Sequence, residues 1–207
     1  MGAERSLLIR RGRRLNLLTL GYNVVEAIVS IAAGLAAGSV ALVGFGIDSG
    51  IEVSASVAAL WRLGADREPE RRERAERRAL RIIGVLFLLL AAYVTWESVA
   101  ALLGREAPER SPVGVAILAL SVVVMPVLAR AKRRVALAMG SGALVAEAKQ
   151  TSLCAWLSAI ALAGVGLNAL LGWWWADPVA ALAMVPIIAR EGAEALRGEE
   201  CEDGCAR

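Results

Sequence analysis

The chain has 207 residues, 57% of them hydrophobic, and a mean hydropathy of +0.58. Soluble domains are usually about half apolar, so this composition excludes an ordinary soluble domain and indicates a membrane protein. The formal net charge is +3 and histidine is absent.

Six stretches of the sequence are long and apolar enough to cross a bilayer. A helical span needs about 20 apolar residues, and these runs are too long and continuous for the strands of a barrel. We therefore predict an all-α membrane protein with six transmembrane helices. The predicted spans are Leu15–Ala37, Val40–Leu63, Leu80–Leu103, Val113–Ala129, Ala143–Leu171 and Trp175–Ile188.

The basic residues gather in three segments that six spans would place on one side of the membrane. The positive-inside rule predicts that this side, with both termini, faces the cytoplasm of a bacterial-type plasma (inner) membrane. A nucleic-acid surface is the disfavoured alternative, because these residues alternate with acids and flank spans, as expected for contact with lipid. They are Arg5, Arg10, Arg11, Arg13, Arg14, Arg62, Arg67, Arg71, Arg72, Arg74, Arg77, Arg78, Arg81, Arg130, Lys132, Arg133 and Arg134.

This topology divides the chain into three parts. Residues 1–14 form a basic cytoplasmic segment, residues 15–196 a six-helix transport domain, and residues 197–207 a short acidic cytoplasmic tail. The tail contains Cys201 and Cys205, which we consider as further candidate ligands that capture metal. Disorder of the tail without metal capture is the open alternative.

Acidic residues interrupt the first two predicted spans. Glu26 lies about three turns into the first helix and either lines a cation pathway or bonds Asn23 or a serine on a neighbouring helix. Asp48 and Glu52 stand one helical turn apart in the second span and leave the same face. A charge near the bilayer centre is costly and rarely lacks a role. The pair predicts a cation site, and the alternative is protonated acids that face a helix partner.

A short internal repeat gives this pair a counterpart in the fifth span. Gly38-Ser39-Val40-Ala41-Leu42-Val43 resembles Gly140-Ser141-Gly142-Ala143-Leu144-Val145. At equal distances from the two serines stand Asp48 and Gln150, then Glu52 and Cys154. Because the two spans are predicted to run in opposite directions, the repeat is inverted, as in many transporters with a midplane site. Asp48, Glu52, Gln150 and Cys154 are therefore the predicted metal ligands.

The chemistry of these four ligands indicates a transition metal. Zinc accepts thiolate and carboxylate ligands in tetrahedral geometry, and an amide oxygen is a poorer fourth ligand. Cobalt, cadmium and ferrous iron are alternatives, whereas magnesium and calcium do not seek sulfur. The ligands must lose protons to hold a metal, which predicts protons as a second substrate. Glu147, one turn before Gln150, is a further candidate ligand, and the alternative is that it pairs with Lys149 or reaches the membrane interface.

At these residues the chain resembles the cation diffusion facilitator (cation efflux) family of divalent metal transporters. The resemblance rests on GSVALVGFGIDSGIE in the second span, GSGALVAEAKQTSLCAWLS in the fifth, WADPVAAL at the start of the sixth, and Glu97 in the third. It covers about Leu15–Leu196 and implies six helices, proton-coupled metal efflux and a homodimer. Gln150 and Cys154 depart from the family's His/Asp and Asp pair, and the family's C-terminal metal-sensing domain is not represented.

The function predicted from the sequence is therefore divalent metal transport by alternating access. A non-transporting scaffold, a metal sensor or a partner subunit on the same fold is the second interpretation, because the fifth-helix pair is unusual. A membrane enzyme is disfavoured, since no nucleophile and base are found together, and no prosthetic group is expected.

Overall fold

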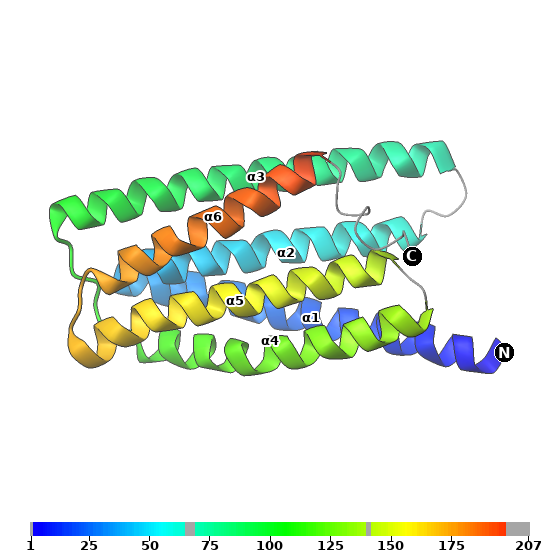
Figure 1. Cartoon of the computed structure of the whole chain (residues 1–207), viewed down its shortest axis with the longest axis horizontal. Coiled ribbons are helices and arrows are strands. Elements are labelled where there is room, and N and C mark those ends of the chain that lie inside the picture. The colour runs from blue at the N-terminus through cyan, green and yellow to red at the C-terminus, as the bar shows by residue number, and fades with distance from the viewer. Residues whose placement is uncertain (1, 65–68, 140–141, 198–207) are drawn as a thin grey trace.

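The protein is an elongated bundle of helices, shown in Figure 1. The computed structural model describes the backbone of residues 2–64, 69–139 and 142–197, and these residues form six helices and no strands. The predicted all-α class is confirmed for this part of the chain. The helices are α1 (Gly2–Ala37), α2 (Val40–Gly64), α3 (Pro69–Gly104), α4 (Pro112–Met139), α5 (Gly142–Leu171) and α6 (Ala176–Arg197).

The helix bounds match the predicted spans closely at the end of the bundle where α1, α3 and α5 finish. α1 ends at Ala37 and α5 ends at Leu171, both as predicted. At the other end α1, α3 and α6 extend several turns beyond the apolar runs, into charged sequence. A helix satisfies its own backbone hydrogen bonds, so it continues where its side chains reach water or headgroups.

A tight turn between α1 and α2 fixes where α2 begins. Gly38 adopts a φ of 66°, a left-handed conformation that glycine adopts without steric cost. The Ser39 amide then donates to the Gly34 carbonyl at 3.0 Å, which closes the end of α1. α2 starts at Val40, directly after this turn.

Asp177 caps the N-terminus of α2 from a distant part of the chain. Its carboxylate accepts hydrogen bonds from the Ser39 hydroxyl and from the backbone amides of Val40 and Ala41, at 2.9 and 3.4 Å for the amides. Asp177 precedes Pro178 at the start of α6, a pattern typical of an N-cap for its own helix. Asp177 instead lies inside the first turn of α6 and joins α6 to α2.

Asp177→Ala is expected to lower the unfolding free energy by about 1–3 kcal/mol, because it removes a buried cap and leaves amides unpaired. Thermal unfolding of the purified protein in detergent measures the loss. Asp177→Asn, which keeps one acceptor oxygen, is the control and should lose less. An unchanged melting temperature in the alanine variant would show that this contact adds nothing to stability.

The bundle has the surface of a membrane protein. Within the described residues, four helical segments are long and apolar enough to cross a bilayer: Arg10–Ala37, Arg81–Gly104, Pro112–Ala138 and Ala148–Leu171. Large apolar side chains such as Ile28 and Val123 are exposed on their outer faces. α2 and α6 fall outside this set, so a count of six spans stays a prediction.

α2 is the central helix of the bundle. It packs against α1, α3, α5 and α6, and its residues from Ala41 to Gly46 are all buried. α1 approaches it closely, since a Cβ on Gly34 would lie 2.8 Å from the Val43 backbone nitrogen. This close approach of the two helices lets a polar side chain of α1 hydrogen-bond to Glu52 of α2.

Candidate metal centre

Three of the four predicted ligands meet in the interior of the bundle. Asp48 and Glu52 come from one face of α2, and Cys154 comes from α5. One ligand atom of each lies within 4.8 Å of the others, and all three side chains are buried. Two carboxylates from α2 and a thiol from α5 therefore form a compact cluster, which we call the acid–thiol cluster.

α1 supplies the polar neighbours of the acid–thiol cluster. The Asn23 amide donates a hydrogen bond to a Glu52 carboxylate oxygen at 2.8 Å. Glu26 accepts from the hydroxyls of Ser49, at 2.8 Å, and Ser121. The Cys154 thiol also lies 3.7 Å from a Glu26 oxygen. Of the two alternatives for Glu26, bonding to serines on neighbouring helices is therefore observed, and the thiol contact places it beside the cluster as well.

One oxygen of Asp48 is buried without a hydrogen bond. Among the described residues, no donor reaches this Oδ2 atom. A buried carboxylate oxygen without a hydrogen bond is costly. A cation at the cluster would remove this cost, so the donor set is chemically suited to a metal ion.

The other candidate ligands lie differently. Gln150 sits on α5 one turn before Cys154 and is half-buried. Glu147 lies in α5, but its side chain is outside the described residues, as are Cys201 and Cys205. Lys149, considered as a partner of Glu147, forms an ion pair with Glu194 of α6 at 3.3 Å.

Besides Glu26 and Asn23, which were considered in the sequence, several polar residues around the cluster were not singled out from it. Buried polar side chains recur along α1 at steps of three and four residues, so they lie on one face of the helix. We call this face the polar stripe of α1. Ser121 and Lys132 are buried on one side of α4, and Lys132 was counted only among the basic inner-side residues. A search for polar residues at helical spacing inside apolar runs would have found Ser121 and the polar residues of α1, but not Lys132, which lies in a basic run. The polar stripe of α1 consists of Asn16, Thr19, Asn23, Glu26 and Ser30.

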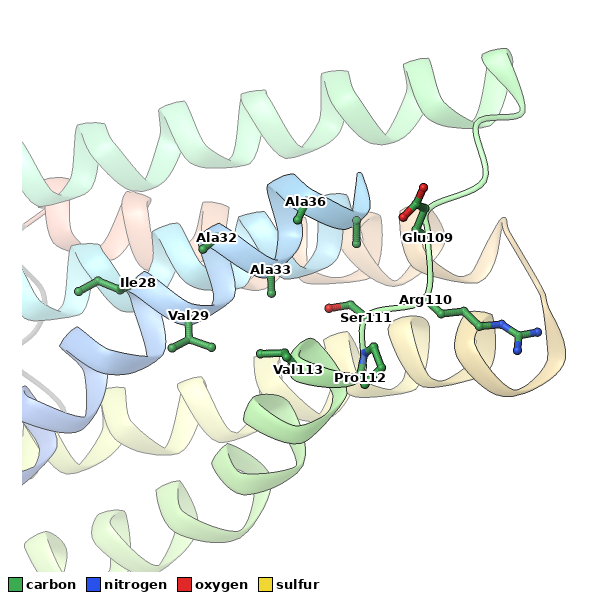
Figure 2. A pocket seen from close by; sticks show the side chains of 11 residues that line it. Ile28, Val29, Ala32, Ala33, Ala36, Glu109, Arg110, Ser111, Pro112 and Val113 are labelled. Carbon is green, nitrogen blue, oxygen red and sulfur yellow. The ribbon is translucent and has the colours of Figure 1, made fainter.

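A separate hollow lies between α1 and the segment leading into α4 (Figure 2). Its lining is mainly small and apolar, with Val29, Ala33 and Val113 on the two helices. Glu109 and Arg110 stand at its rim, on the loop before α4. One carboxylate without further ligands makes this hollow a poor metal site, and the acid–thiol cluster remains the candidate.

Comparison with known proteins agrees with this architecture. Residues 17–198 match the cation efflux transmembrane domain. The chain is also 26% identical over 183 residues to an uncharacterized transporter of Synechocystis sp., an alignment that covers 84% of this chain and 58% of the relative. The chain thus spans little more than half of that relative's length. Cation efflux proteins are transporters rather than enzymes. With its match over most of the helical bundle, the chain belongs to the cation efflux family of multi-pass membrane proteins.

Proposed function

We propose that the protein exports a divalent transition-metal cation across the plasma (inner) membrane in exchange for protons. The observation that carries this proposal is the convergence of Asp48, Glu52 and Cys154 within 4.8 Å, inside the transmembrane domain of a cation efflux protein. Charged groups at such depth are retained mainly for function. The Asp48 Oδ2 atom is buried without a hydrogen-bond partner in the part of the chain that the structure describes, which supports a cation as its partner.

The dimensions of the acid–thiol cluster suit zinc or a metal of similar chemistry. A tetrahedral zinc site with bonds of about 2.0 Å to oxygen and 2.3 Å to sulfur has ligand atoms roughly 3.3–3.6 Å apart. The ligand atoms of the cluster lie within 4.8 Å of one another. They would therefore have to move slightly closer together to hold zinc, or would hold a larger ion such as cadmium. Gln150 and Glu26 are the two candidates for a fourth ligand, one turn away on α5 and 3.7 Å from the Cys154 sulfur respectively.

Proton exchange follows from the same ligands. Carboxylate and thiolate hold a metal in their deprotonated forms, so loading the site releases protons and protonation favours release of the metal. The inverted repeat supports alternating access, in which two related halves of the bundle open the midplane site to either side in turn.

The remaining parts of the proposal concern the assembly in the membrane. Six spans with both termini in the cytoplasm satisfy the distribution of basic residues. Residues 15–196 then form the transport domain, between the basic segment 1–14 and the acidic tail 197–207. The resemblance to the family supports a homodimer in the lipid bilayer.

Flux in proteoliposomes tests the function directly. Vesicles that contain the purified protein, a metal-sensitive dye and a pH-sensitive dye are exposed in turn to zinc, cobalt, cadmium and ferrous iron. Metal uptake that accelerates with an outward-directed proton gradient, together with counterflow of protons, is the expected result. Uptake no faster than in empty vesicles for every metal would overturn the proposal. Saturable metal binding without flux would favour the metal-sensing alternative.

A further inference from the structure

Lys132 is a buried cation beside the acid–thiol cluster. It lies on α4 and is 2% exposed, and it alone is buried among the basic residues whose burial the structure describes. Its ammonium group donates to the Thr151 hydroxyl of α5 at 3.3 Å and to the Asn16 amide oxygen of α1 at 3.4 Å. Three helices therefore hold this charge inside the bundle.

The contacts of Lys132 place its charge close to the level of the candidate ligands. Thr151 stands three residues before Cys154 on α5, which is less than one helical turn. The ammonium group also interacts electrostatically with Glu52. Asn16, the second partner, is the member of the polar stripe nearest the start of α1. Lys132 therefore stands at the predicted cytoplasmic edge of the acid–thiol cluster.

Among the described residues, Lys132 is the cationic neighbour of a group of buried anionic ligands. Glu26, Asp48 and Glu52 contribute three carboxylates to the interior, and Cys154 contributes a thiolate when it holds a metal. These groups attract a cation, whereas the ammonium group of Lys132 repels it. Because both effects are strong in a region of low dielectric, the charge of Lys132 offsets part of the attraction.

From this geometry we infer that Lys132 is a specificity-determining residue, a tethered cation that weakens metal binding and sets the preferred charge of the transported ion. This inference rests on the proposed metal transport. Repulsion between the ammonium group and the bound ion lowers affinity enough for release, and it grows with the charge of the ion. Removal of the ammonium charge should tighten binding and slow release.

The experiment measures Cd²⁺ and La³⁺ binding by calorimetry to the full-length protein, in a Cys201→Ser/Cys205→Ser background that leaves Cys154 as the remaining cysteine. Lys132→Gln, which keeps hydrogen-bonding capacity without charge, should bind Cd²⁺ about tenfold or more tightly, with a larger gain for La³⁺. In transport assays its KM and its kcat should both fall. Lys132→Met is the second charge-removing variant and should behave alike.

Two matched controls separate charge from structure. Lys132→Arg keeps the charge and should restore wild-type affinity, whereas Lys149→Gln removes an exposed lysine of α5 and should change little. Unchanged or weaker Cd²⁺ binding in both charge-removing variants, or equal gains for the two ions, would overturn the inference alone. A background protein that binds no Cd²⁺ would overturn the proposed function and this inference with it.

Discussion

Asp48→Asn is expected to reduce metal flux at least about 100-fold while leaving the protein folded. The substitution removes one negative charge from a buried site, where its attraction for a divalent ion is far stronger than in water. Asparagine has nearly the same shape, so packing against the neighbouring helices is retained. Metal uptake into proteoliposomes measures the loss.

The same substitution should stabilise the protein when no metal is present. One Asp48 oxygen is buried without a donor among the described residues, and a neutral amide reduces the cost of burying this side chain. The melting temperature without metal should therefore rise, whereas the increase that metal produces in the wild type should disappear. A residue kept for packing would show the opposite pattern, with lower stability and unchanged metal response.

Glu97→Gln is the matched control for Asp48→Asn. Glu97 is a partly exposed acid of α3, outside the group of close ligand atoms. Loss of its charge should leave flux close to wild type, because its carboxylate is not among the close ligand atoms of the acid–thiol cluster. Normal flux in Asp48→Asn would remove this residue from the proposed site, whatever the control shows.

The sequence was most informative where local periodicity determines the outcome. The spacing of Asp48 and Glu52 places both on one face of any helix, and the inverted repeat then pointed to Cys154 on α5. The structure brings these three together. The helix ends at Ala37 and Leu171 were also predictable, because glycine follows each of them and adopts a left-handed conformation.

The sequence was least informative where packing between helices determines the outcome. Lys132 lies in a basic run with Arg130, Arg133 and Arg134, and no local feature distinguishes it. It becomes buried because α1 and α5 supply acceptor oxygens at its position, and such contacts are not visible in one helix. Asp177 likewise caps α2 rather than its own helix, because the start of α6 lies beside the start of α2.

Gln150 shows a further limit of prediction from a repeat. The equal spacing from the two serines predicts Gln150 opposite Asp48, in the same way that it pairs Cys154 with Glu52. The repeat fixes the position along the helix, but the exposure of each side chain depends on the neighbouring helices. Gln150 is half-buried while Cys154 is fully buried beside Glu26. Its role as a ligand stays a prediction, and Glu26 is the competing candidate.

Cys154→Asp should change which metal the protein prefers. The thiolate is the one soft ligand among the predicted four, and soft ligands favour cadmium and zinc over manganese. Replacing sulfur with a carboxylate oxygen should shift the ratio of Cd²⁺ to Mn²⁺ affinity by about 100-fold toward Mn²⁺. Competition binding to the purified protein, in a Cys201→Ser/Cys205→Ser background, measures this ratio.

The aspartate variant should also show how strongly the cluster depends on a bound cation. Cys154 lies 3.7 Å from a Glu26 oxygen and within 4.8 Å of Asp48 and Glu52, so a new carboxylate adds repulsion to a buried acidic group. The variant should be less stable than wild type without metal and should recover stability when Mn²⁺ is added. Cys154→Ser, which removes the thiol without adding charge, should weaken Cd²⁺ binding and leave metal-free stability nearly unchanged. An unaltered metal preference in the aspartate variant would show that the sulfur is not a ligand and that Cys154 serves packing alone.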